Sequence, residues 1–233
     1  MQALTVKQKT LLTYLAFLFF SGIGIIYGNS LGDQVPNLRV WTSANLFWLL
    51  LGIPFAMVQP EAKLPEFWQP EVFNKSRLWK PIAVGILFGL LDIIVVKVIM
   101  HPEPYTELPP FLQPFPYSIF LYFSGAFEIE VFYRLIPMTL LLLIGAKYKN
   151  GRYWLQFFWV GAILTSLREP LEQFPRGSVL FIMYSLASGF LMNLLQAMYF
   201  RNAGFLAAIA LRIGHYLLWH ILLGMYVQFI EIK

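Results

Sequence analysis

The chain has 233 residues, of which 58% are hydrophobic and only 12% are charged, and its net charge of +5 comes mostly from lysines and arginines that flank apolar segments. Soluble domains carry about 25% charged residues, so this composition excludes an ordinary water-soluble domain and indicates a polytopic membrane protein with no nucleic-acid partner. The absence of cysteine excludes disulfides, thiolate metal sites and a cysteine nucleophile.

Seven apolar segments follow one another along the chain, each near the ~20 residues that a helix needs to cross a bilayer. Segment 60–80 is rich in Pro, Trp and charge, so we expect an interfacial loop there. The proline-rich segment 101–116 is expected to form an external loop. The sequence thus predicts one all-α membrane domain over 1–233, with transmembrane helices at 10–28, 42–59, 81–100, 117–146, 153–168, 179–199 and 205–230.

The distribution of basic residues predicts the orientation. If the N-terminus is cytoplasmic, the outer segments hold only Arg39, Arg176 and Lys233. This asymmetry favours a cytoplasmic N-terminus under the positive-inside rule. We expect an integral protein of a prokaryotic inner or plasma membrane, whose inner segments hold Lys7, Lys9, Lys63, Lys75, Arg77, Lys80, Lys147, Lys149, Arg152 and Arg201.

Several ionisable residues fall inside the predicted helices, where each charge costs about 2.5–3.5 kcal/mol on insertion scales. Such groups normally face the protein interior and pair with one another. Glu130 and Arg134 are four residues apart, which predicts an ion pair on one helix face. The full set within or at the ends of helices is Asp92, Lys97, Glu128, Glu130, Arg134, Arg168, Glu169, Arg212, His215 and His220.

Depth in the membrane suggests which of these residues meet. At a rise of ~1.5 Å per residue, Glu130, Glu169 and His220 each lie roughly 22–25 Å from the cytoplasmic end of their helix. Arg212, Tyr216 and His220 recur every four residues, so they form one polar stripe, and His215 lies on the neighbouring stripe. We therefore expect a site built from three helices around two carboxylates and an imidazole.

The stretch AFEIEVFYRLIP, residues 126–137, resembles the first motif of the CPBP family of CAAX-prenyl-protease and bacteriocin-processing membrane proteins. That motif reads EExxxR, often with an aromatic residue before the arginine, and motifs FxxxH and HxxxN follow on later helices. The resemblance implies a bundle of seven or eight transmembrane helices. It also implies, for the proteases of the family, a water activated by glutamate and histidine within the bilayer.

This chain departs from the family pattern at the residues that would carry out catalysis. When the motif is aligned on Arg134, Glu130 takes the place of the second glutamate, but Ile129 replaces the first, which is the family's presumed general base. Glu128 is one residue away and points about 100° from that position. In the later motifs, Glu169 stands where a histidine is expected and His220 where an asparagine is expected.

Three functions remain open. The first is an intramembrane peptidase acting on a membrane-anchored peptide, in which Glu130 or Glu169 is the general base and His220 polarises the scissile carbonyl. The second is a non-catalytic relative that serves as a scaffold, chaperone or accessory subunit for a membrane-protein partner. Ion or proton transport ranks last, because the candidate path would be cationic or neutral. The candidate residues are Glu130, Arg134, Glu169 and His220, with Glu128, Arg168, Arg212, His215 and Tyr216 around them.

Each candidate also has a plain structural interpretation. The Glu130–Arg134 pair would then fix helix packing, and the segment 168–170 would be only a helix end, because Pro170 cannot continue the hydrogen-bond ladder. No cofactor is required. A divalent metal on Glu130, Glu169 and His220 is an alternative to a hydrogen-bonded network, because carboxylates and imidazole are suitable ligands.

Overall fold

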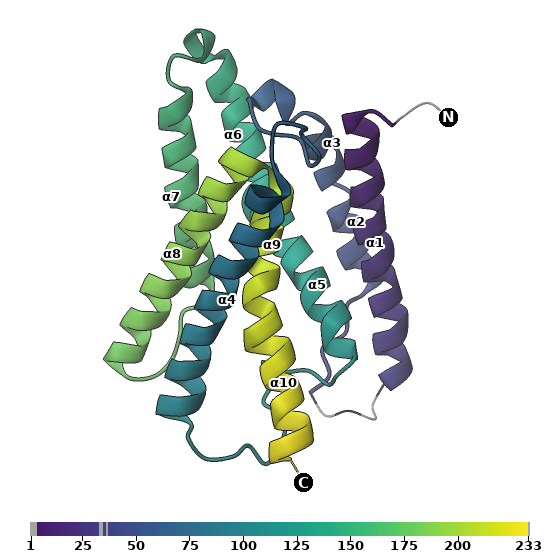
Figure 1. The fold of residues 1–233 in the computed structure, drawn as a ribbon, viewed down its shortest axis with the longest axis vertical. Coiled ribbons are helices and arrows are strands. Elements are labelled where there is room, and N and C mark those ends of the chain that lie inside the picture. The colour runs from purple at the N-terminus through teal and green to yellow at the C-terminus, as the bar shows by residue number, and fades with distance from the viewer. Residues whose placement is uncertain (1–3, 33–34, 36, 233) are drawn as a thin grey trace.

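The computed structural model describes residues 4–32, 35 and 37–232, and within these ranges the protein is all-helical (Figure 1). Wider π-helical turns continue several helices: η3 (Lys75–Trp79), η4 (Ile93–Met100), η5 (Val131–Leu135), η7 (Leu217–Leu222) and η8 (Val227–Glu231). The α-helices are α1 (Val6–Leu31), α2 (Ser43–Leu49), α3 (Gly52–Met57), α4 (Lys80–Asp92), α5 (Tyr117–Glu130), α6 (Ile136–Lys147), α7 (Trp154–Glu172), α8 (Val179–Ala203), α9 (Phe205–Tyr216) and α10 (Leu223–Tyr226).

Five helical stretches within the described residues are long and apolar enough to cross a membrane. Their outward faces carry large apolar side chains such as Phe19, Ile26 and Leu180, each more than 70% exposed. A surface of this kind is unfavourable in water and suits lipid. The five stretches are Val6–Leu31, Lys75–Met100, Tyr117–Gly151, Val179–Ala203 and Phe205–Glu231.

Two predicted helix boundaries were wrong. The segment 42–59 is not one helix but two, α2 and α3, joined by a turn. Pro54 has no N–H to donate to the carbonyl of Leu50, which weakens the ladder at that turn. The predicted helix end at Arg168 is also absent, because α7 continues through Pro170 to Glu172. The loss of one donor, to the carbonyl of Ser166, is not enough to end the helix there.

The closest helix contact lies between α4 and α9. A Cβ atom added at Gly85 would lie 1.9 Å from the carbonyl oxygen of Leu211, and one added at Gly214 would lie 2.3 Å from that of Ile82. Only glycine permits this backbone approach, which is the packing that membrane helices favour. The approach brings the end of α4 beside the end of α9, as Figure 1 shows.

On the other side of the bundle, α1 packs against α5 through aromatic rings. Phe20 stacks on Phe120, and Tyr14 donates a hydrogen bond to the carbonyl of Leu49 at 2.6 Å. The rings thus join α1 to α5, and the Tyr14 bond joins α1 to α2. On its other side α5 packs against α9, and the buried candidates Glu130, Glu169 and Arg212 lie between the helices.

Candidate functional site

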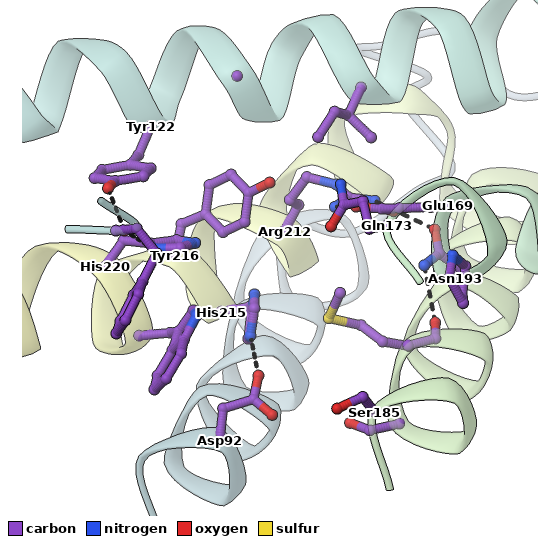
Figure 2. Close-up of a pocket in the computed structure, with 18 of the residues that line it drawn as sticks. Asp92, Tyr122, Glu169, Gln173, Ser185, Asn193, Arg212, His215, Tyr216 and His220 are labelled. Carbon is purple, nitrogen blue, oxygen red and sulfur yellow. Dashed lines mark hydrogen bonds and ion pairs between the residues drawn. The ribbon is translucent and has the colours of Figure 1, made fainter. Parts of the chain in front are cut away.

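A buried charge cluster of Glu130, Arg134, Glu169 and Arg212 lies in the middle of the bundle. Arg212 binds both carboxylates. Its Nε donates to Glu130 at 2.7 Å, and its two terminal nitrogens donate to the two oxygens of Glu169 at 2.8 and 2.7 Å. This bidentate geometry is the strongest that an arginine and a carboxylate form. Figure 2 shows Arg212 beside Glu169.

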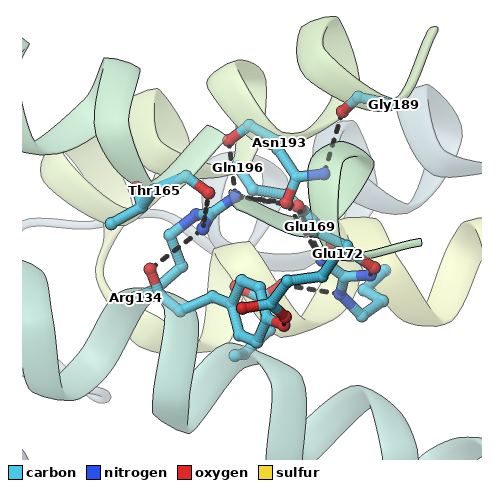
Figure 3. A network of polar contacts seen from close by, with 10 residues as sticks. Arg134, Thr165, Glu169, Glu172, Gly189, Asn193 and Gln196 are labelled. Atoms are coloured by element: carbon cyan, nitrogen blue, oxygen red, sulfur yellow. Dashed lines mark hydrogen bonds and ion pairs between the residues drawn. The ribbon is translucent and has the colours of Figure 1, made fainter. Parts of the chain in front are cut away.

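Arg134 occupies a separate part of the cluster. Its guanidinium donates to the backbone oxygen of Asn193 at 2.8 Å and to the side-chain oxygen of the same residue at 2.5 Å. It also donates to the carbonyl of Thr165 at 3.4 Å, a set of contacts visible in Figure 3. Asn193 and Gln196 of α8 also accept from Arg212, at 3.3 and 3.1 Å, so α8 supplies neutral oxygens to both arginines.

The predicted ion pair between Glu130 and Arg134 was wrong. Glu130 ends α5, and the chain then takes the π-helical turn η5, which contains Arg134. A π-turn has more residues than an α-turn, so side chains four residues apart no longer share a face. Glu130 pairs with Arg212 instead, and Arg134 turns toward α7 and α8.

The cluster is electrically balanced. It holds two carboxylates and two guanidiniums, and its four side chains are buried, with Glu169 the most exposed at 8%. Removing water from a charge is expensive, and excellent geometry with opposite charge is needed to offset the cost. Both oxygens of Glu169 and one oxygen of Glu130 accept hydrogen bonds from Arg212. The other Glu130 oxygen is buried without a hydrogen-bond partner.

A cavity of about 610 Å³ adjoins the cluster, and Glu169 and Arg212 form part of its wall. Its lining comes from α4, η4, α5, α7, α8, α9 and η7, and from loop residues Arg39, Trp41, Phe111, Gln173 and Pro175. Aromatic side chains such as Phe111, Phe181 and Trp219 alternate in it with polar ones such as Ser185 and Gln173. Ligand sites are typically concave, mostly apolar and furnished with a few polar groups, as this cavity is.

His220 lies in the wall of this cavity but outside the charge cluster. Its Nδ1 donates to the carbonyl of Phe111 at 2.8 Å, and its ring stacks on Tyr122 with 4.3 Å between ring centroids. Tyr122 donates to the same carbonyl at 2.6 Å. The expected meeting of His220 with Glu130 and Glu169 was wrong, because the loop 101–116 supplies the imidazole with a partner of its own. Within the part of the chain that the structure describes, no three His, Asp or Glu side chains are close enough to hold a metal.

The remaining candidates divide between the cavity and the surface. Glu128 and Ile129 line the cavity, and Glu128 accepts a hydrogen bond from Asn45 at 3.2 Å. Tyr216 also lines it, beside Arg212. Arg168 is half-exposed on α7, where it pairs with Glu172 at 2.7 Å, so it belongs to the surface of the bundle.

A second polar centre lies in the cavity wall, and its pairing was not predicted from the sequence. His215 on α9 and Asp92 on α4 are 2.7 Å apart, and Tyr184 on α8 donates to the other Asp92 oxygen at 2.7 Å. A signal for this pairing was present: Asp92 follows glycines at 85 and 89 on an otherwise apolar helix. Small residues at that spacing predict close helix contact, which gives the carboxylate a partner on the neighbouring helix.

Comparison of the chain with family models, with curated proteins and with solved structures gave no match. The resemblance to the CPBP family therefore rests on the stretch 126–137 and on the order of the later polar residues. It remains a prediction.

Proposed function

We propose that the chain is a CPBP-like integral membrane protein of a prokaryotic cell membrane, with seven membrane-crossing units and a cytoplasmic N-terminus. Five of the units are the long apolar helices. The other two are the shorter apolar pair α2–α3 and the helix α7. The excess of lysine and arginine in the segments assigned to the cytoplasm supports the orientation.

Its function, in this proposal, is to bind a membrane-anchored peptide or a membrane-protein segment without cleaving it. The observation that carries the proposal is the pairing of Arg212 with both Glu130 and Glu169. A general base needs a carboxylate that can reach a water beside the ligand. Both oxygens of Glu169 are bonded to Arg212, and Glu130, which gives Arg212 one oxygen, does not line the cavity. What remains is a cavity suited to holding a ligand, as in a scaffold, a chaperone or an accessory subunit.

The character of the cavity supports a peptide as the ligand. Its volume of about 610 Å³ is within the ~300–1,000 Å³ typical of ligand sites. Its aromatic walls suit apolar side chains, while Ser185, Gln173 and Tyr184 offer hydrogen bonds to a backbone. An extended peptide in a membrane needs such bonds, because no water is present to supply them.

A photo-crosslinking experiment tests binding. A photoreactive phenylalanine analogue is placed at Phe181, in the cavity wall, or at Phe229, which is 58% exposed and does not line the cavity. The purified protein in nanodiscs is illuminated with a library of apolar decapeptides. Crosslinks from position 181 above those from 229, with the peptides intact by mass spectrometry, are the expected result. Equal crosslinking at the two positions would reject the proposal.

Hydrolysis is the second candidate function, and a specific observation favours it. Glu128 and His220 both face the cavity, and neither pairs with an arginine. Glu128 would take a proton from a water that attacks the amide carbon, and would return it to the leaving amine. If the crosslinking mixtures contain cleaved peptides, this candidate predicts that cleavage disappears in both Glu128→Gln and His220→Ala.

A further inference from the structure

Glu128 is the carboxylate of the cavity wall that keeps an unused oxygen. The other two carboxylates of the wall, Asp92 and Glu169, have both oxygens bonded to neighbouring side chains. Glu128 accepts one hydrogen bond, from Asn45 at 3.2 Å, and within the described part of the chain nothing donates to its other oxygen. That oxygen is not among the completely buried unpaired atoms, so it is accessible at the cavity wall.

The hydrogen bond from Asn45 holds the carboxylate in a fixed orientation. Asn45 lies in the first turn of α2, and its side-chain oxygen accepts from the backbone N–H of Thr42 at 3.0 Å and from the Thr42 hydroxyl at 3.1 Å. Two donors on the amide oxygen determine which end of the amide is which, because nitrogen cannot accept them. The amide nitrogen therefore faces Glu128, and the second carboxylate oxygen is left for the cavity.

Glu128 also has no cationic partner. None of the ion pairs between the residues that the structure describes includes it. It lies in the long apolar stretch Tyr117–Gly151, about 16 Å along the helix from Tyr117. Charged side chains at such a depth are normally paired, and one neutral amide offsets little of the cost of removing a carboxylate from water. A positively charged group brought by the ligand would supply the missing partner.

The rest of the wall is compatible with a cation beside Glu128. Arg212 is fully buried, and its charge is matched by the two carboxylates that it binds. Arg39 donates to Tyr122, which is six residues, or about 9 Å, before Glu128 on α5. Neither arginine therefore pairs with Glu128. Aromatic rings in the wall, such as Trp41, attract cations through their faces.

We propose that Glu128 binds a primary ammonium group of the peptide held in the cavity, with Asn45 and Thr42 as positioning residues. This inference rests on the proposed peptide-binding function and specifies the chemistry of its ligand. An ammonium has three donors and no acceptor, so it complements a carboxylate oxygen that nothing else bonds. Lysine side chains and free amino termini both carry this group.

Matched peptides test the contact through the charge. An N-acetylated decapeptide that crosslinks from position 181 is prepared with lysine, or with uncharged norleucine, at each position in turn. A second pair contains no lysine and differs only in a free or acetylated amino terminus. Affinities are measured for the wild type, for Glu128→Gln, which keeps an acceptor for Asn45, and for Glu107→Gln, an exposed glutamate of the loop 101–116 that does not line the cavity.

Removing the charge at position 128 should reduce the preference for a cationic peptide. At one lysine position, or for the free amino terminus, the ratio of the two affinities should be about tenfold higher in the wild type and in Glu107→Gln than in Glu128→Gln. Taking the ratio within each protein cancels any difference in how the two peptides partition into the bilayer. The pair that shows the effect identifies which source of the ammonium is bound.

The outcomes separate this inference from the proposed function. If the peptides bind but every ratio is the same in the wild type and in Glu128→Gln, the inference is overturned and peptide binding stands. If no peptide binds to the wild type, both fail. Carbodiimide coupling in the wild type does not depend on a variant folding. It should join the peptide amine to Glu128, as mapped by mass spectrometry, and coupling to another carboxylate instead would also overturn the proposal.

Discussion

Replacing Arg212 by methionine should destabilise the protein more than any other single change in the charge cluster. The guanidinium is fully buried and donates to Glu130, Glu169, Asn193 and Gln196. Methionine fills a similar volume but removes the guanidinium that both buried carboxylates bond to, which leaves two negative charges with only Arg134 to balance them. Breaking a buried ion pair costs about 3–5 kcal/mol, which is a large part of the stability of a typical domain. For a chain of this size the melting temperature should fall by roughly 6–20 °C.

The assay is thermal unfolding of the purified protein in detergent, followed by intrinsic tryptophan fluorescence. The matched control is Arg152→Met, because Arg152 is exposed on the 148–153 connection and should change stability by less than about 0.5 kcal/mol. The double variant Arg212→Met, Glu169→Gln removes one charge of each sign, leaves Glu130 with Arg134, and should recover much of the loss. Equal melting temperatures for Arg212→Met and Arg152→Met would refute the reasoning.

Three further changes test the packing that positions the cavity. Gly85→Ala places a methyl group 1.9 Å from a carbonyl oxygen of α9 and should lower the free energy of unfolding by about 1–3 kcal/mol. The control Gly125→Ala meets nothing within 4 Å, so thermal unfolding should show no change or a slight stabilisation. Lys97→Met removes the ion-pair partner that lies 2.9 Å from Glu231 and should lower the free energy of unfolding by about 3 kcal/mol. The loop 101–116 should then be cleaved faster by a protease. Unchanged cleavage would argue against this ion pair holding the loop. His220→Phe keeps a stacked ring but loses one hydrogen bond to that loop, so the free energy of unfolding should fall by about 1 kcal/mol. A fall of more than 3 kcal/mol would indicate a larger role for His220.

Much of the fold follows from apolar length and charge alone. Segments of ~20 apolar residues predict helices because a bilayer gives the backbone no other partners. The same reasoning fails where backbone geometry changes locally. The turn before Pro54 and the continuation of α7 past Pro170 depend on whether neighbouring contacts replace a lost hydrogen bond, and no count of apolar residues contains that information.

The site was harder to predict than the fold, for a different physical reason. Glu130 and Glu169 were expected at one level in the membrane, and the structure brings them to a single arginine. Arg212 is eight residues, or about 12 Å, from His220 along its helix, and this spacing predicted that it would lie apart from the two carboxylates. An arginine side chain is long and membrane helices tilt, so the level of the backbone does not fix the level of the charge. The π-turn after Glu130 then removed the partner that helical spacing had assigned.

The position of Ile129 adds a second argument for the proposed binding function. In the family that the motif resembles, this position holds the presumed general base, and here its side chain lies in the cavity wall as an apolar group. The second glutamate of the motif, Glu130, does not line the cavity and is held by Arg212. The chain thus keeps the carboxylate that packs the helices together and lacks the one that would face a ligand at that position. In the proposed binding function this position supplies an apolar wall, and a hydrolytic function would have to use Glu128 as its base instead.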